Sequence, residues 1–353
     1  MFCERLTCYN LFMLEGFNHS NVHESDIERG VESHEAIFTP EYYKRKKNTI
    51  LRHIEEVTEV IMSRLLEISN EKYRKIEQDD SADALDLKAS LVRAHPFSTT
   101  WEQLEESKPE EDLQGLADQR NKKLDEYMNF LEDLSAGRVA GLTVLHRGSQ
   151  DFIQTNNFDV VDVKYRINIK VDVYDSVYDF MVKIASSFKE DSNLIAGGFQ
   201  IKTLNEDARD AIIIYLPESS FPMAAKHIID LFKDNEGYND RHSDKGIMFG
   251  VPLEYEEGGK LPGIRVTEEP AGNYNYSTFN TMQADILSKA VILYIHDVYK
   301  GDKTKACEDL GDLESDGRIK WEQDFPSYYA RAAKDLIGEG ANLDNIAFLS
   351  TGK

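Results

Sequence analysis

The sequence predicts an α+β protein, with an α-helical N-terminal part followed by a mixed sheet that carries helices on one face. Before residue 140, apolar residues recur at helical spacing. From Val160 to Val173 they alternate, as in a strand with one buried face. From residue 160 onward the segments follow the order β-α-β-β-α-β. This is the split βαβ pattern, which places a layer of helices on one face of a sheet.

Residues 1–140 are expected to be the helical part. Residues 41–77 have apolar residues three and four positions apart and predict one long amphipathic helix. A shorter helical stretch follows it, and the acidic segment 102–114 is expected to be a linker. Residues 115–135 resume the helical pattern, and Gly137 is a suitable stop. Such a part would pack on the rest of the chain or bind a partner, including a chaperone.

Residues 141–353 are expected to form the α+β domain. The predicted strands are 160–173, 194–204, 211–216, 246–253 and 263–267. The predicted helices are 177–188, 221–232, 280–299 and 326–336, the last of which ends at Gly338.

The composition excludes several classes of function. The chain has 353 residues and a formal net charge of −23, which argues against binding to nucleic acid or to an anionic membrane. This acidity indicates either a well-solvated surface or a face for a basic partner. No apolar stretch is long enough to span a membrane, and the first residues make a poor secretory signal.

Motifs for metals and cofactors are absent from the sequence. Cys3, Cys8 and Cys307 form neither a disulfide framework nor a zinc spacing, and a reducing cytosol suits them. The chain has no Walker loop, no GxGxxG after a strand, no HExxH and no GxSxG. We therefore expect no cofactor and no metal.

Five segments carry a family resemblance. They are RNKKLDEYMNFL at 120–131, KYRINIKVDVYDSVYDFMVKIASSF at 164–188, DAIIIYL at 210–216, GIRVTEEPAGNYNYSTFNTMQADIL at 263–287 and the C-terminal SYYARAAKDLIGEGANLDNIAFLSTGK. In this order they resemble the HopA-type family of type III secretion effectors, over roughly residues 115–353. The resemblance does not extend to most of the N-terminal third.

The resemblance implies a role and a reaction. HopA-type effectors are injected from the bacterial cytoplasm into the host cytoplasm, perturb immune signalling there, and engage a small chaperone through their N-terminal regions. Related domains of ribosomal peptide biosynthesis are lyases that eliminate phosphate from phosphoserine or phosphothreonine. Three functions remain open: a phosphothreonine or phosphoserine lyase effector, a non-catalytic effector that binds a host immune-signalling protein, and a dehydrating lyase of peptide biosynthesis.

Phosphate elimination needs a base for the α-proton and cations for the phosphate. Lys164, Arg166 and Lys170 share one face of the strand 160–173, opposite its apolar residues, and Lys202 ends the next strand. We expect Lys202 to be the base, because a buried lysine can lose its proton near neutral pH. Arg166 is the second expected catalytic residue, and Lys164 would help to hold the phosphate.

Three further residues complete the expected phosphate site: Arg209 precedes the strand 211–216, and Arg265 and Ser277 flank the loop before the helix 280–299. The segment KYRINI also resembles a cation-x-cation strand of phosphothreonine lyases, which have His where Arg166 stands. Because Arg stays protonated, a general acid at this position is in doubt. Alternating cations are more usual on a solvent-facing strand, however, and an ordinary Ser or Asn N-cap is the favoured explanation of the loop that contains Ser277.

Overall fold

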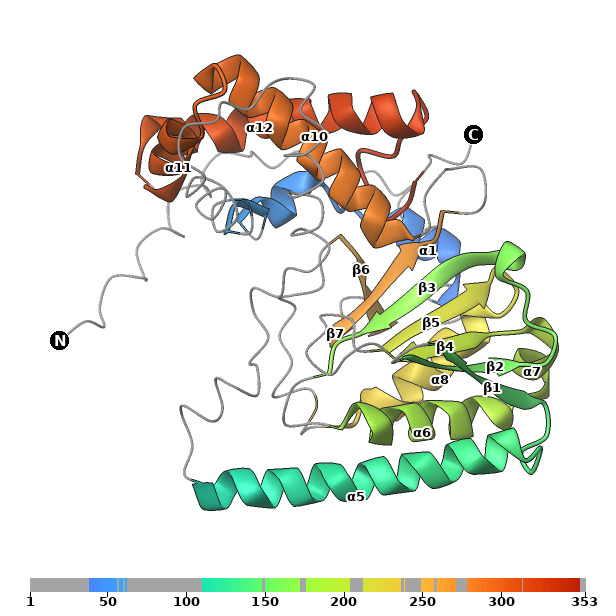
Figure 1. Cartoon of the computed structure of the whole chain (residues 1–353). Helices are drawn as coiled ribbons and strands as arrows, with labels where there is room; N and C mark the ends of the chain where they lie inside the picture. The colour runs from blue at the N-terminus through green and yellow to red at the C-terminus, as the bar shows by residue number, and fades with distance from the viewer. Residues whose placement is uncertain are drawn as a thin grey trace, which may run out of the picture. The chain divides into compact units, whose positions relative to one another are not determined.

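The structure is a computed structural model, and it describes residues 38–55, 57–59, 61, 110–147, 150–171, 176–203, 212–235, 238, 249–256, 259–270, 278–312 and 314–349. The helices are α1 (Pro40–Lys44), η3 (Ile50–His53), α5 (Glu110–Ser135), η4 (Val160–Asp162), α6 (Val177–Lys189), α7 (Ser192–Gly197), α8 (Phe221–Phe232), α10 (Phe279–Tyr299), α11 (Lys303–Gly311) and α12 (Asp316–Ile337). The strands are β1 (Leu142–Arg147), β2 (Gln150–Thr155), β3 (Val163–Ile169), β4 (Gln200–Thr203), β5 (Ile212–Pro217), β6 (Val251–Glu256) and β7 (Gly259–Glu268) (Figure 1).

Among the described residues, seven strands form one sheet in the order β1-β2-β4-β5-β3-β7-β6. The predicted α+β class is confirmed. The sheet is antiparallel at every pairing, however, whereas a mixed sheet was predicted. The reason is the split βαβ unit: β3 and β4 run parallel, but β5 lies between them and pairs with both.

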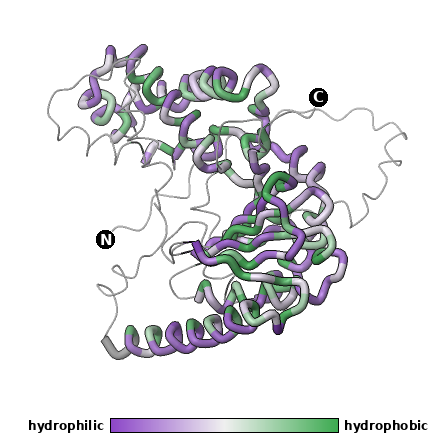
Figure 2. Tube along the Cα trace, turned by 45° about the vertical axis from the view of Figure 1, so that its right-hand side comes forward, coloured by the Kyte–Doolittle hydropathy of each residue, from purple (hydrophilic) through white to green (hydrophobic). Residues whose placement is uncertain are grey.

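One face of the sheet is apolar and is covered by helices. Tyr165 and Ile167 of β3 point to this face and join a buried cluster with residues of α6 and α8. Figure 1 shows α6 and α8 against the sheet, with α5 packed on α6. α5 adds Tyr127 and Leu131 to the cluster, although most of its length is hydrophilic and drawn purple in Figure 2. The alternation predicted for 160–173 is therefore confirmed on its apolar side within β3, but its start is wrong, because residues 160–162 form η4 and Val161 is exposed.

The helix layer is joined by a polar chain around His227 of α8. Its Nδ1 lies 2.8 Å from the hydroxyl of Ser187 on α6, and its Nε2 lies 3.1 Å from a carboxylate oxygen of Asp191. Asp191 also caps α7, because its other oxygen accepts the backbone N–H groups of Asn193 and Leu194. These contacts hold α6, α7 and α8 together.

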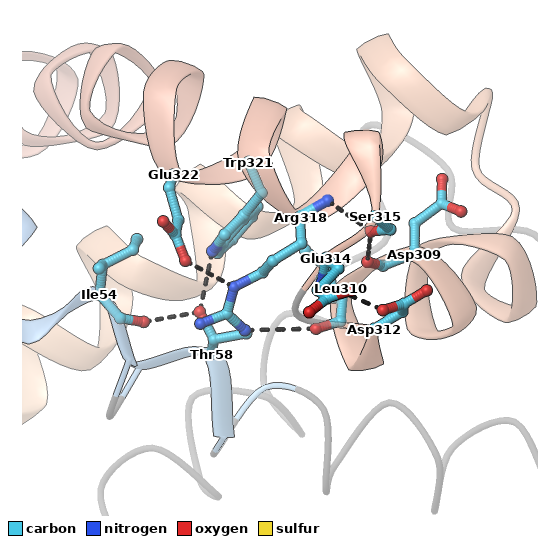
Figure 3. Close-up of polar contacts among 10 residues, drawn as sticks. All are labelled: Ile54, Thr58, Asp309, Leu310, Asp312, Glu314, Ser315, Arg318, Trp321 and Glu322. Carbon is cyan, nitrogen blue, oxygen red and sulfur yellow. Dashed lines mark hydrogen bonds and ion pairs between the residues drawn. The ribbon is translucent and has the colours of Figure 1, made fainter. Parts of the chain in front are cut away.

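A second buried cluster is formed by α10, α11 and α12 with the segment around η3. Trp321 of α12 is fully buried, and its indole N–H donates to the hydroxyl of Thr58 at 2.9 Å. Thr58 in turn donates to the carbonyl of Ile54 at 2.6 Å (Figure 3). Beside them, Arg318 donates to Glu322 and to the carbonyl of Leu310. The N-terminal residues near 54–58 thus belong to the same core as the C-terminal helices.

The predicted helix 41–77 is wrong at its beginning. α1 ends at Lys44, and Asn48 forms a bridge with Asn345 near the C-terminus before η3 begins. The side chain of Asn345 donates to the carbonyl of Tyr43, which holds this break in place. Residues 54, 55, 57–59 and 61 are helical as predicted, and Ile54, Val57 and Ile61 are buried. Residues 62–77 and the shorter stretch after them lie outside the described residues.

Other boundaries also differ. The predicted linker 102–114 is wrong from Glu110, where α5 begins, and the predicted strand 194–204 is α7 followed by β4. α12 is ten residues longer at its start than predicted, with Pro326 inside it rather than at its beginning. The hairpin of β1 and β2 was not predicted at all. The division into domains at residue 140 stays a prediction.

Candidate functional site

The second face of the sheet, which we call the polar face, is defined by the register of the strands. Arg166 of β3 lies opposite Tyr215 of β5 and Thr267 of β7. Tyr215 lies opposite Gln200, which lies opposite Gln154. Because paired residues of antiparallel strands point the same way, these side chains form one row across the sheet.

A second row runs beside the first. Asn168 lies between Ile213 of β5 and Arg265 of β7, and Ile213 lies opposite Lys202 of β4. Lys202 in turn lies opposite Phe152 of β2. Thus Arg166, Arg265 and Lys202, which come from three strands, share the polar face.

Lys170 continues the same face one step beyond the second row. Its backbone N–H donates to the carbonyl of Gly263, so the pairing of β3 with β7 extends past Ile169. Arg265 is then the diagonal neighbour of both Arg166 and Lys170, at Cα separations of roughly 7–8 Å. Arg166 and Lys170 are therefore both neighbours of Arg265 on the polar face.

Deep burial distinguishes these cations from those on an ordinary solvent-exposed strand surface. The exposed fractions are 1% for Arg166, 3% for Lys170 and 8% for Arg265, and Asn168 and Thr267 are each 1% exposed. A charge this deeply buried requires an oppositely charged or hydrogen-bonding partner. With Glu269, these residues form what we call the buried cationic cluster.

Arg166 is fixed by neighbours on two elements. Its Nε donates to the hydroxyl of Thr267 at 2.8 Å, and its Nη2 donates to Oδ1 of Asn280 in the first turn of α10 at 2.5 Å. The guanidinium lies 5.3 Å from the ring centroid of Phe279. A carboxylate oxygen of Glu269 lies 3.5 Å from Nε. The guanidinium therefore has a single orientation, with its positive charge partly balanced.

Glu269 reaches the cluster because the strand pairing continues beyond β7. Its backbone N–H donates to the carbonyl of Lys164 at 2.8 Å, so its side chain points to the same face as those of Thr267 and Arg265. The carboxylate is 8% exposed. Among the described residues of the cluster, three side chains are cationic and one is anionic.

Two other features shape the cluster. A Cβ atom on Gly250 would lie 2.5 Å from Cβ of Arg265, so only glycine permits the start of β6 to approach this residue. The side-chain amide of Asn168 donates to Thr267 at 3.3 Å. Within the described part of the chain, its buried oxygen Oδ1 accepts no hydrogen bond. The cluster thus presents an acceptor beside its cations.

Lys202 lies on the polar face at the far side of Ile213. Adjacent strands are about 4.8 Å apart, so the Cα atoms of Lys202 and Asn168 are roughly 10 Å apart. A lysine and an arginine side chain that extend toward each other can span this distance. The ammonium of Lys202 lies 5.6 Å from the ring centroid of Phe152. The structure therefore brings Arg166, Arg265 and Lys202 to one face.

The remaining predicted site residues have other positions. Lys164 is exposed and donates to Glu218 at 2.9 Å, and this hydrogen bond raises the pKa of the lysine. Its ammonium therefore pairs with Glu218, which is not a member of the buried cationic cluster. Arg209 and Ser277 lie outside the described residues. Their assigned roles stay predictions.

Sequence analysis gave no role to Asn168, Thr267, Glu269 or Asn280, and it noted Lys170 only for its place on the strand. The alternation of β3 contained a signal for Asn168 and Lys170, because they share the parity of Arg166. The other three come from elements separated from β3 by about a hundred residues. No local pattern connects them.

Within the described residues, no group of three or more His, Cys, Asp or Glu side chains is placed to hold a metal ion. The same part of the chain contains no helix that is both long and apolar enough to cross a membrane.

Comparisons with known proteins find structural likeness but no sequence relative. No protein-family model matches the chain, and no curated protein matches its sequence. A solved structure described as the effector protein from Pseudomonas syringae pv. tomato strain DC3000 aligns with 84% of this chain and 100% of its own, at a TM-score of 0.43 and 12% sequence identity. A likeness of this size does not assign a family or an activity.

Proposed function

We propose that this chain is a bacterial effector that acts on a phosphorylated host protein and removes phosphate from phosphoserine or phosphothreonine by β-elimination. One observation carries the proposal: three buried cations gather on one sheet face of a chain whose net charge is −23. The segments that resemble HopA-type effectors support the role of an effector in the host cell. They also support type III secretion from the bacterial cytoplasm into the host cytoplasm, with a chaperone as a possible secretion partner.

The buried cationic cluster suits a phosphate monoester. Arginine binds phosphate through paired, parallel N–H groups, and a dianion is favoured where cations are held in place without water. Arg265 lies between Arg166 and Lys170 on the sheet, so a phosphate near it would contact more than one cation.

The elimination requires a neutral base. The base removes the α-proton, the Cα–Cβ double bond forms, and the Cβ–O bond breaks to release phosphate, which the cations stabilise as it leaves. Lys170 is 3% exposed and lies diagonally beside Arg265, so its side chain is near the position proposed for the phosphate. Lys202 lies on the same face but farther from Arg265, with Ile213 and Asn168 between them along the row. We therefore propose Lys170 as the base and keep Lys202, the residue that the sequence favours, as the alternative.

Arg166 fits the role of a positioning residue in this scheme. Its contacts with Thr267, Asn280 and Glu269 already use several of its N–H groups. Its charge raises the potential around Arg265 without requiring direct contact with the substrate.

The balanced charge of Arg166 also favours a second candidate function. If Glu269 and Asn280 occupy the N–H groups of Arg166, the polar face could bind an acidic segment of a host immune-signalling protein without any reaction. A lyase of ribosomal peptide biosynthesis is the third possibility, and a precursor peptide and a kinase encoded beside this chain would favour it.

Mass spectrometry of phosphothreonine peptides incubated with the full chain tests the proposal. We expect a dehydro residue, with loss of phosphoric acid, and at least a hundredfold slower reaction for Lys170→Met. Lys233→Met is a matched control, because this lysine follows the last residue of α8 and pairs with Asp230. Restored hydroxyl groups would indicate a phosphatase. Peptides that bind but remain intact would favour the non-catalytic function, and full activity of Lys170→Met with none for Lys202→Met would assign the base to Lys202.

A further inference from the structure

Phe249, which lies two residues before the start of β6, has a backbone conformation that residues other than glycine rarely adopt. Its φ is 71°, in the left-handed region, and its side chain is 4% exposed. A bulky residue keeps such a conformation only where its surroundings impose it, and such positions cluster at functional sites. The contacts of Phe249 show what imposes the conformation here.

Asn48, from the segment between α1 and η3, holds the carbonyl group of Phe249. Its side-chain amide donates to this carbonyl oxygen at 2.8 Å, and both residues are buried. The backbone of Asn48 is itself fixed: its N–H donates to the carbonyl of Asp344 at 2.8 Å, and its carbonyl accepts from the N–H of Ile346 at 2.9 Å. Asn48 therefore meets Phe249 from a fixed position.

His53 of η3 fixes the orientation of the Asn48 side chain. Its Nε2 lies 2.9 Å from Oδ1 of Asn48, and its ring centroid lies 5.4 Å from that of Phe249. Because Nδ2 of Asn48 donates to Phe249, Oδ1 is the acceptor, so Nε2 of His53 carries the proton. The amide cannot turn over without the loss of both hydrogen bonds.

The carbonyl that Asn48 holds belongs to the peptide group that joins Phe249 to Gly250. Gly250 lies directly against the cluster, because a Cβ atom on it would be 2.5 Å from Cβ of Arg265 and 3.4 Å from Cγ2 of Thr267. Thr267 accepts the hydrogen bond from Nε of Arg166. A shift of this peptide group would therefore change the packing beside two members of the buried cationic cluster.

From these contacts we infer that Asn48 is a positioning residue of the phosphate site, which acts on Arg265 through the peptide group between Phe249 and Gly250, and that His53 supports it. The inference rests on the proposed function, because the buried cationic cluster must hold the phosphate. It makes the segment 38–53 part of the site, although the family resemblance covers only residues 115–353.

Fluorescence anisotropy with the full chain and a labelled phosphothreonine peptide tests this inference, with the unphosphorylated peptide measured in parallel. We expect Asn48→Ala to bind the phosphopeptide about tenfold more weakly and the unphosphorylated peptide unchanged, because residues without ligand contact shift affinity by this order. His53→Leu removes the donor to Asn48 and should weaken binding likewise. His53→Gln restores an N–H donor and should recover most of the affinity.

Tyr42→Phe is the matched control for a general loosening of the segment. It removes the hydrogen bond from the Tyr42 hydroxyl to Glu254 of β6, which does not involve Gly250. We expect this variant to keep the phosphopeptide affinity of the natural chain. Thermal unfolding verifies that each variant is folded, and the two His53 variants, at a half-buried position, decide the question if Asn48→Ala does not fold.

Gly250→Ala tests the route by which Asn48 acts. The added methyl group would collide with Arg265 and should weaken phosphopeptide binding at least about tenfold. If Asn48 acts through the same contact, the double variant of Asn48→Ala and Gly250→Ala should bind less than about twofold more weakly than Gly250→Ala alone.

The outcomes separate the inference from the proposed function. Unchanged phosphopeptide affinity in folded Asn48→Ala, equal affinities of His53→Leu and His53→Gln, or an equal loss in Tyr42→Phe overturns the inference even if phosphate is still eliminated. Fully additive losses in the double variant also overturn it. The expected losses in a chain that eliminates no phosphate support the positioning role and count against the lyase. No binding of the phosphopeptide by the natural chain overturns both.

Discussion

Arg166 of β3 donates a hydrogen bond from Nη2 to Oδ1 of Asn280, a residue 114 positions further along the chain, over 2.5 Å. This contact joins the centre of the sheet to the first turn of α10. It is a charge-assisted hydrogen bond from a buried guanidinium to a half-buried amide, a class that contributes more to stability than a neutral pair. The orientation of the guanidinium therefore depends on where α10 begins.

Replacement of Asn280 tests this dependence. Asn280→Ala removes the acceptor of a buried charged donor, and we expect a loss of about 1.5–3 kcal/mol in the free energy of unfolding. Asn280→Asp restores an acceptor and should retain more of the stability. It should also weaken phosphopeptide binding, because it adds a negative charge beside the cations. Urea denaturation and anisotropy measure the two effects, and equal stability of Asn280→Ala and the natural chain would contradict the role of this contact.

Glu269→Gln should change stability and affinity in opposite directions. It leaves Arg166 without its buried counter-charge, which costs up to about 3–5 kcal/mol in the free energy of unfolding. The same change removes the one carboxylate in the described cluster, so phosphopeptide affinity should rise about tenfold. Calorimetric titration of the folded variant measures this. Weaker binding by a folded variant would show that Glu269 contacts the peptide directly.

Asp179 links α5 to α6 and should make stability depend on pH in the acid range. Burial raises the pKa of this carboxyl, but the hydrogen bonds from Lys183 and Lys123 outweigh burial, and the pKa lies below its ordinary value of 3.8. A lowered pKa contributes stability above the unfolded value and loses it as the pH falls through the folded value. Asp179→Asn should thus lose about 0.5–1 kcal/mol at pH 7, and the difference should shrink as the pH falls below 3.8.

Melting temperatures at pH 7, 5 and 3 measure this difference. Asp230→Asn is the matched control, because Asp230 makes a more exposed ion pair within one helix. A constant difference between Asp179→Asn and the natural chain at all three values would exclude the ion pairs as its cause.

The hydrogen bond from Trp321 to Thr58 should couple the two residues energetically. Thr58→Val leaves the buried indole N–H without an acceptor, at a cost of about 1–3 kcal/mol. Trp321→Phe removes the donor and also leaves a cavity. The double variant should lose less than the sum of the single variants, because each single change already removes the bond. Chemical denaturation of all four proteins measures the coupling, and strict additivity would argue against the contact.

The elements that sequence analysis predicted best are those with a regular local pattern. The helix expected at 221–232 has these bounds in the structure, and that expected at 177–188 is one residue longer. In each helix, the spacing of the apolar residues predicts a single buried face. β1 and β2 were missed because their apolar residues are few and are interrupted by polar ones such as His146, Asp151 and Gln154.

Errors of position occurred where distant contacts override the local pattern. The expected helix from residue 41 is broken near Asn48, because the segment pairs with Asn345 and its neighbours. α12 contains Pro326 inside its length, because packing on α10 stabilises the helix on both sides of the proline. Neither contact has a signal in the sequence nearby.

The sequence alone determined that β3 has an apolar face and a cationic face, because side chains alternate along any strand. It could not determine whether the cationic face meets solvent. Only the tertiary structure decided this: β7 and the start of α10 enclose Arg166, while Lys164 on the same strand remains exposed. The physical reason is that burial and ion pairing depend on residues about a hundred positions apart, which come together only when the sheet and α10 assemble.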